Sequence, residues 1–205
     1  CFLLQGVTGS GKTQVFSELI HRMIKRGQQV LLLVPEIGLV GQMVSRIRNQ
    51  LDGELCVSHS GIANGARTKA FVASARGVAD VLIGTRSALF TPMPNLGLIL
   101  VDEEHDGAYK NQEGCRYSAR DLAIVRAKQT NIPIVLSSAT PSLETWQQAE
   151  LGKYQRLCLL DRPGQQPQPT IRLIDVRYDK PKDGLSEAAQ RAVRYAIDHG
   201  QQALV

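Results

Sequence analysis

Residues 6–13 read G-V-T-G-S-G-K-T, and this segment constrains the fold more than any other part of the chain. A short apolar run, residues 1–5, precedes it, and Val15, Leu19 and Met23 follow it at helical spacing. The segment therefore lies at a turn from a buried strand into a helix. In such a turn glycines permit close backbone approach, while the backbone amides and the helix N-terminus attract a polyphosphate. The sequence predicts a phosphate-binding loop made of Gly6, Val7, Thr8, Gly9, Ser10, Gly11, Lys12 and Thr13.

Two side chains of this loop have predicted roles in chemistry. Lys12 would reach the β- and γ-phosphates, and the Thr13 hydroxyl would be a ligand of the Mg²⁺ that bridges them. The predicted cofactors are ATP and Mg²⁺. A glycine-rich turn that only caps a helix is the alternative, but glycine makes up about 7% of average sequence, so the complete pattern is rare by chance.

An acidic run, Asp102-Glu103-Glu104-His105, follows the apolar stretch of residues 96–101. Asp102 is therefore expected at the carboxyl end of a strand, the edge where open α/β sheets bind ligands. We predict that Asp102 holds the Mg²⁺, while Glu103 orients the attacking water and takes its proton. Together with Lys12 these are the predicted catalytic residues. The run alone could also be a solvated turn, but its pairing with the phosphate loop favours the functional interpretation.

Apolar runs alternate with helical patterns along most of the chain. The predicted strands are residues 1–5, 30–34, 55–58, 81–83, 98–101 and 134–136, and the predicted helices are residues 38–51, 66–76, 119–129 and a helix after Pro141. This alternation predicts an α/β fold in which a mostly parallel sheet is flanked by helices. Together with the phosphate loop it indicates a P-loop NTPase domain.

The composition changes at residues 161–170, D-R-P-G-Q-Q-P-Q-P-T, where prolines and a glycine indicate a connector. A strand at 171–176, a turn through Pro181 and Gly184, and a helix at 186–199 are expected beyond it. The predicted domains are therefore residues 1–160 and residues 161–205. Because the chain opens within an apparent strand and ends at 202–205 on another, we expect a fragment of a longer protein.

The composition limits the class of protein only broadly. The 205 residues are 43% apolar without a long apolar stretch, so no membrane partner is expected. The four cysteines never form a Cys-x-x-Cys pair, which indicates neither a local zinc site nor a disulfide framework and suits a reducing cytoplasm. The net charge of +5 suits a partner that carries phosphates, although the charge alone is weak evidence.

Polar turns follow three further predicted strands, with the sequences V-P-E-I-G at 34–38, H-S-G at 59–61 and G-T-R-S-A at 84–88. Because the carboxyl ends of parallel strands share one rim of a sheet, these turns could bind a phosphodiester backbone. The candidate contacts are Pro35, Glu36, His59, Ser60, Arg86 and Ser87. Ordinary turn residues are the alternative for each segment taken alone.

Residues 138–140, S-A-T, end the last predicted strand of the sheet in the same way. The hydroxyls of Ser138 and Thr140 could bond to the acidic loop, including His105. We predict that these three residues report the state of the nucleotide to the rest of the protein.

The ordered motifs together resemble the first motor lobe of superfamily 2 helicases, which have a RecA-like fold. The motifs are G-x-T-G-S-G-K-T, P-E-I-G-L, H-S-G, G-T-R-S-A-L-F-x-P, D-E-E-H and S-A-T-P-S-L-E-T. More closely the chain resembles the primosomal protein N′ (PriA) family of replication-restart helicases, and the match covers essentially its whole length. Residues 106–123 are the most specific part, because they are similar to that family's aromatic-rich loop. Ser118 departs from the usual histidine, and Val40-Gly41 replaces the usual Thr-Pro.

This resemblance implies an ATP-dependent 3′-5′ DNA helicase that acts in primosome assembly and replication restart. It implies single-stranded and forked DNA and replication-restart proteins as partners, in the bacterial cytoplasm at the nucleoid. It also implies regions outside these residues: a second lobe with an arginine finger, a zinc-binding insertion downstream, and an amino-terminal DNA-binding region. No zinc site is expected in this chain itself.

The aromatic-rich loop has a physical interpretation of its own. Tyr109 and Tyr117 offer faces on which bases can stack, and Lys110, Arg116 and Arg120 offer charge for phosphates. Because the loop lies directly downstream of Glu103, contact with DNA could change the geometry of hydrolysis. The alternative is that the tyrosines pack on the neighbouring helix.

Two other functions stay open from the residues. One is the motor lobe of a different superfamily 2 translocase, such as a restriction, repair or RNA motor, although the aromatic-rich loop favours DNA. The other is an isolated module that binds nucleotide and DNA without turnover.

Overall fold

The computed structural model describes every residue except 52, 160, 162–169 and 179–180. Its contacts divide the chain into two compact units, Cys1–Gln165 and Gln166–Val205, which are described separately. The predicted connector at 161–170 falls almost wholly on residues outside the described part. The assignment of residues 1–160 and 161–205 to two parts of a motor stays a prediction.

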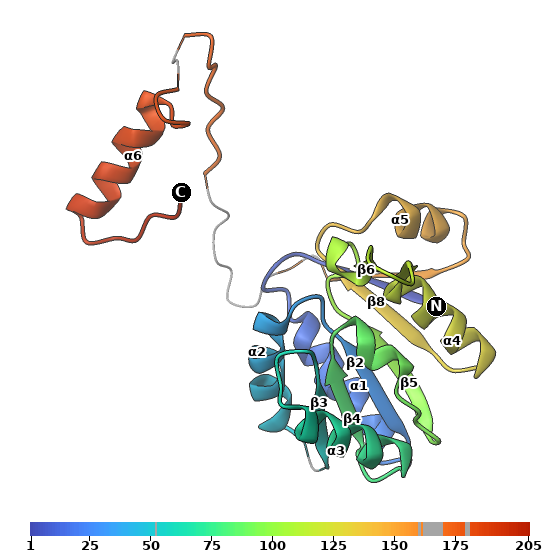
Figure 1. Ribbon diagram of the computed structural model, residues 1–205. Coiled ribbons are helices and arrows are strands. Elements are labelled where there is room, and N and C mark those ends of the chain that lie inside the picture. Colours follow the sequence, from blue (N-terminus) through green and yellow to red (C-terminus); the bar gives the residue numbers. More distant parts are fainter. Residues whose placement is uncertain (52, 160, 162–169, 179–180) are drawn as a thin grey trace. The chain divides into compact units, whose positions relative to one another are not determined.

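The first unit is built on a parallel β-sheet, drawn as arrows in Figure 1. Its strands have the spatial order β3-β4-β2-β5-β8-β1-β9, and every neighbouring pair is parallel. The strands are β1 (Phe2–Gly6), β2 (Gln29–Leu33), β3 (Leu55–Ser58), β4 (Val81–Gly84), β5 (Leu96–Val101), β8 (Ile134–Ser138) and β9 (Gln155–Leu159). The carboxyl ends of parallel strands lie on one edge, so the predicted motifs share that edge.

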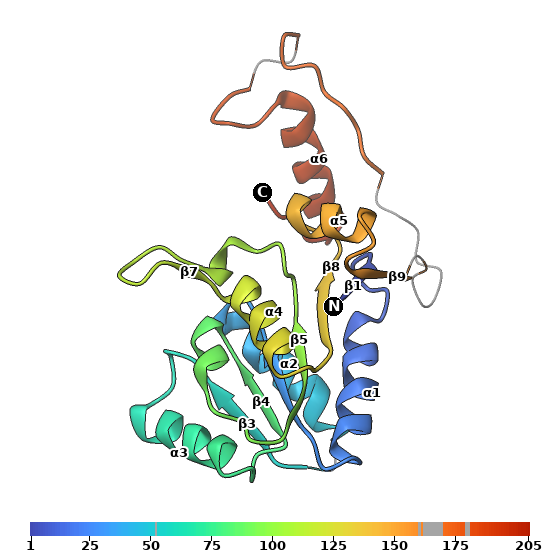
Figure 2. The same ribbon diagram turned by 90° about the vertical axis from the view of Figure 1, so that its right-hand side faces the viewer.

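Helices cover both faces of this sheet (Figures 1 and 2). The helices α1 (Lys12–Ile24) and α2 (Ile37–Arg48) pack on one face. The helices α3 (Asn64–Ala75) and α4 (Ala119–Gln129) and the 3₁₀ helix η1 (Arg86–Phe90) pack on the other. The α/β prediction is confirmed, and β3 and α4 have the bounds that the sequence predicts.

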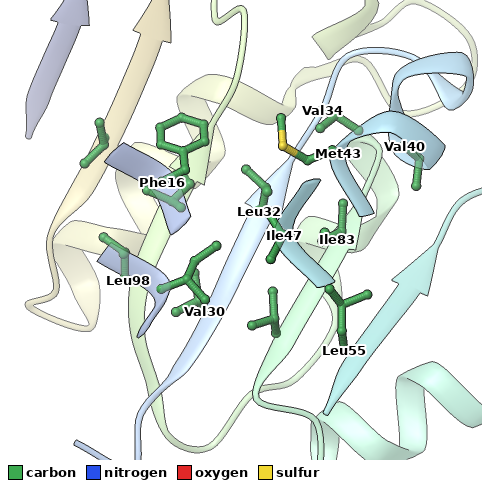
Figure 3. Packing of buried hydrophobic residues seen from close by; sticks show 14 of the residues in the cluster. Phe16, Val30, Leu32, Val34, Val40, Met43, Ile47, Leu55, Ile83 and Leu98 are labelled. Atoms are coloured by element: carbon green, nitrogen blue, oxygen red, sulfur yellow. The ribbon is translucent and has the colours of Figure 1, made fainter. Parts of the chain in front are cut away.

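The central strand β2 explains why the sequence pattern is apolar rather than alternating. Val30 and Leu32 face the core under α1 and α2 with Phe16 and Met43, as Figure 3 shows. Leu31 and Leu33 face the opposite core, with η1 and α4. A strand that is buried on both faces must be apolar at every position.

Several short elements complete the first unit. The acidic run leads into a 3₁₀ turn, η2 (Gly107–Tyr109), and a small antiparallel hairpin of β6 (Lys110–Asn111) and β7 (Tyr117–Ser118). The helix α5 (Leu143–Glu150) follows β8. The edge strand β9 is not predicted from the sequence, because its Q-R-L-C-L segment is mostly exposed and carries no strong apolar signal.

Serine caps begin three of the helices. The hydroxyls of Ser118, Ser142 and Ser186 accept a hydrogen bond from the backbone N–H three residues later, at α4, α5 and α6 (Glu187–Asp198). Ser118, where the resembling family usually has histidine, therefore has a structural role here. Val40, the other departure, is buried in the core under α2.

The second unit contains α6, which agrees with the predicted helix at 186–199. The predicted strand at 171–176 is wrong: these residues form no strand, and Leu173 is 98% exposed. A strand needs a neighbour that pairs with its backbone, and the described part of the chain offers none there. The strand expected at 202–205 is absent for the same reason. None of the described helices has the length and apolar character that a bilayer crossing requires.

Candidate nucleotide site

The predicted phosphate loop runs from the end of β1 at Gly6 to the start of α1 at Lys12. Gly9 has φ 83° and Gly11 has φ 92°, in the left-handed region that only glycine enters without strain. Gly11 caps α1 without a side chain, and the Gln14 N–H donates to the Gly11 carbonyl, so the first amides of the helix, at Lys12 and Thr13, are the ones placed to meet an anion. The local geometry is that of an anion-binding loop.

Lys12 extends across this loop. Its ammonium donates to the Gly6 carbonyl at 2.8 Å and lies 3.9 Å from Oε1 of Glu103. A cavity of about 680 Å³ opens here, lined by the loop, by Asp102 and Glu103, and by polar residues of α1 and α2. The structure thus brings the two predicted motifs together in the lining of one cavity.

The residues of the cavity fit a polyphosphate. The buried hydroxyl of Ser10 has no hydrogen-bond partner among the described residues, so it is a donor without an acceptor. A Cβ on Gly6 would come within 2.4 Å of that hydroxyl, which shows how closely the loop folds on itself. Ser10 itself does not line the cavity, but Thr8, Gly9, Gly11, Lys12 and Thr13 do, so a phosphate there would lie against the loop backbone and the Lys12 ammonium.

Asp102 has the surroundings of a cation ligand. Burial, and secondly the charge of Glu103, raise its pKa above the usual aspartate value, although Ser137 donates to Oδ1 at 3.2 Å. The charge of Lys12 lowers this pKa only as a smaller effect, so the ionised carboxylate would be stabilised further when a cation binds. Thr13 lines the same cavity, so both predicted Mg²⁺ ligands lie at the site.

Glu103 lies between the loop and the next strand end. Its backbone has φ 45°, a strained value for a residue other than glycine. Its Oε2 lies 3.6 Å from Nδ1 of His105, and that nitrogen lies 2.8 Å from the Ser138 hydroxyl. The Thr140 N–H donates to the same hydroxyl at 2.9 Å. The three residues predicted to report nucleotide state therefore form one chain of contacts that begins at Glu103, although Thr140 joins it through its backbone.

Sequence reasoning missed Glu104, the third residue of the acidic run. Its side chain is buried and accepts from Arg120 at 3.1 Å, from the Ser142 N–H at 2.7 Å and from the Thr145 hydroxyl at 2.8 Å. Arg120 is thereby buried, so the prediction that it offers charge to DNA phosphates is wrong. In a run of charged residues, the sequence pattern does not show which carboxylate is buried. Only the presence of Arg120 as a possible partner could have suggested the burial of Glu104.

Two of the predicted DNA contacts are also corrected. Tyr109 is 1% exposed and donates to the carbonyls of Asp102 at 2.6 Å and Leu33 at 3.0 Å. Its ring cannot stack on a base, so the prediction for this tyrosine is wrong. Pro35 is buried at the end of β2 and offers no side-chain surface.

The other predicted contacts with DNA lie on the same edge of the sheet. Glu36, Ser60, Ser87, Lys110 and Arg116 are exposed, and His59 and Tyr117 are half-buried. Arg86 donates through Nη1 to the carbonyls of Ala108 and Lys110, so it also fixes the loop after the acidic run. Their contact with DNA stays a prediction.

The model of the DEAD/DEAH box helicase family matches residues 1–149, which include the phosphate loop, the acidic run and the S-A-T segment. The chain belongs to the DEAD/DEAH box helicase family. The cavity lined by the phosphate loop and the acidic run therefore lies within a helicase motor lobe.

Among curated proteins, this helicase chain is similar to the replication restart protein PriA of several bacteria. It is 43% identical to the Haemophilus influenzae protein over all of this chain and 28% of the relative. It is 41% identical to the Bacillus subtilis protein over 87% of this chain and 22% of the relative. The chain thus spans about a quarter of the length of these relatives.

Solved structures share the fold. RecG bound to a three-way DNA junction matches 80% of this chain and 21% of its own, with a TM-score of 0.59 and 24% identity. A DEAD box protein from Methanococcus jannaschii matches 77% of this chain and 45% of its own, with a TM-score of 0.59 and 22% identity. At these identities the likeness shows the RecA-like helicase fold alone.

Proposed function

We propose that this chain is the ATP-binding lobe of an ATP-dependent 3′-5′ DNA helicase that acts in replication restart. The observation that carries the proposal is the approach of Lys12 to Glu103, 3.9 Å apart, in the lining of a cavity that the phosphate loop also lines. The similarity to replication restart proteins along the whole chain supports the cellular role.

Each residue of the site then has a defined task. Lys12 and the loop amides bind the β- and γ-phosphates, and Asp102 and Thr13 hold Mg²⁺. When bound, Mg²⁺ neutralises charge that develops on the phosphates. Glu103 orients a water and accepts its proton, because its carboxylate faces the cavity beside Lys12. When ATP is hydrolysed, the position of Glu103 changes. The contacts among His105, Ser138 and Thr140 transmit that shift to the end of β8.

The partners in this proposal are single-stranded and forked DNA and the proteins of the primosome. RecG and the helicase MrfA, which share the fold, have been solved with DNA. Because a DNA helicase acts on the chromosome, we place the protein at the nucleoid, in the bacterial cytoplasm. A second lobe would supply an arginine to the γ-phosphate.

Strand separation tests the proposal. A protein that joins this chain to a second helicase lobe should unwind forked DNA with ATP. The Glu103→Gln variant should still bind ATP but neither hydrolyse it nor unwind, because an amide cannot accept the proton. Glu18→Gln, on the exposed surface of α1, is the matched control and should behave as the wild type. Normal turnover by Glu103→Gln would refute the assignment of the base.

A further inference from the structure

Two exposed phenylalanines lie beside a second cavity, away from the nucleotide site. Phe71 of α3 is 47% exposed and Phe90 of η1 is 57% exposed. The cavity measures about 440 Å³, and its lining includes Arg67, Thr68, Phe71, Ser87, Phe90 and Thr91. We call it the Phe71–Phe90 groove. Its size is within the range of sites that hold one small organic group.

The polar lining of the groove favours an anionic ligand. Arg67 is exposed, and hydroxyls of Thr68 and Ser87 lie at the same cavity. The helix that carries Arg67 and Phe71 reads N-G-A-R-T-K-A-F-V-A-S-A and contains no acidic residue. Flat apolar rings beside a cation and hydroxyls match the chemistry of a nucleotide, which has a flat base and a charged phosphate.

The groove is continuous with the surface of the aromatic-rich loop. The ring of Phe90 contacts the ring of Tyr117 edge to face, with centroids 5.2 Å apart and planes at 77°. Tyr117 in turn lines a cavity of about 540 Å³ with Lys110 and Arg116. The aromatic pair therefore joins two cavities, each with its own arginine.

The 3₁₀ helix that presents Phe90 is held in place from α4. Arg126 donates to the carbonyls of Leu89 and of Thr91, the second at 3.0 Å. Arg86 at the other end of η1 donates to the Ala108 and Lys110 carbonyls. A ring on a segment fixed at both ends loses little freedom when a ligand binds, so the exposed position of Phe90 is preorganised.

We propose that the Phe71–Phe90 groove binds a base of single-stranded DNA, with the rings of Phe71 and Phe90 as its walls and Arg67 on the adjoining phosphate. The proposal rests on the proposed function and extends it, because the strand would pass from the aromatic-rich loop over Tyr117 into this groove. A strand so placed would contact η1, which is bonded to the loop that follows Glu103.

The test measures how the chain binds labelled oligothymidylate by fluorescence anisotropy. Phe71→Leu and Phe90→Leu keep an apolar side chain but remove the flat ring, and together they should weaken binding about 5- to 100-fold. Phe71→Trp keeps a flat ring and should bind at least as well as the wild type. Arg67→Gln should reduce the slope of log affinity against log salt by about one.

Two controls separate this inference from the proposed function. Val78→Ala changes another exposed apolar residue near α3 and should leave DNA affinity unchanged. Affinity for Mg-ADP should be the same in all the groove variants, which shows that they fold. If the double leucine variant binds DNA like the wild type, the groove proposal is overturned while the proposed function stands. If the wild-type chain binds no single-stranded DNA, both are overturned.

Discussion

Asp102 shows how a residue suited to binding can reduce the stability of the free chain. Its folded-state pKa is raised, first by burial and then by the charge of Glu103. A carboxylate with a raised folded pKa contributes stability that is present below the unfolded value and is lost as pH rises through the folded value. At neutral pH the ionised group is therefore destabilising until a cation binds.

Replacing Asp102 should increase the stability of the free chain and weaken the effect of Mg²⁺ on nucleotide binding. Asp102→Asn should raise the free energy of unfolding at neutral pH, since the amide removes a desolvated charge, and the gain should disappear in acid. The same variant should lose the dependence of nucleotide affinity on Mg²⁺. Urea unfolding at several pH values and nucleotide titration with and without Mg²⁺ check the two parts. A variant less stable than the wild type at neutral pH would contradict the pKa argument.

At the scale of elements, Glu104 connects three parts of the lobe. It accepts from Arg120 of α4, from Ser142 at the start of α5, and from Thr145 within α5. Because the loop after β5 carries both Glu103 and Glu104, these bonds fix the backbone that positions the predicted base. The network thus anchors the loop after β5 to α4 and α5.

Removing Glu104 should be costly. Glu104→Ala removes the buried carboxylate that receives Arg120, the Ser142 N–H and the Thr145 hydroxyl, and leaves Arg120 only the more exposed carboxylate of Asp121, so we expect a loss of about 3–5 kcal/mol in the free energy of unfolding. Urea denaturation followed by circular dichroism measures it. Glu18→Ala, which breaks the exposed pair with Arg22, should change stability little. A similar small loss for Glu104→Ala would show that the network is not a structural anchor.

Much of the sheet could be predicted because buried parallel strands leave continuous apolar runs, as in L-L-L of β2. The strand β9 and the coil at 171–176 could not be predicted, because pairing at the edge of a sheet depends on neighbouring strands rather than on local sequence. The nucleotide motifs were predictable from spacing. Packing of Tyr109 was left open as an alternative to base stacking, and the burial of Glu104 was not predicted, because a polar side chain enters a core only when distant carbonyls or an arginine receive it.

In the whole molecule, this lobe is expected to bind nucleotide and DNA, whereas ATP hydrolysis also needs a second lobe. An arginine from a second lobe is worth on the order of 10³ to 10⁵ in rate in related NTPases. The 205-residue chain alone should therefore show ATP hydrolysis at or near background and no strand separation. It should still bind single-stranded DNA weakly, with affinity that falls steeply with salt. Robust DNA-stimulated hydrolysis by this chain would mean that another residue or a second copy supplies the charge.

In the proposed function, residues 6–13 and the acidic run form one site for a magnesium nucleotide. Calorimetric titration of the chain with Mg-ADP tests it most directly. We predict measurable binding that weakens by about 10- to 100-fold in Lys12→Ala, because a charge-assisted contact with the phosphates is lost. Lys25→Ala, at the far end of α1, should bind like the wild type. Equal affinities in the wild type and Lys12→Ala, or no binding by the wild type, would contradict the account.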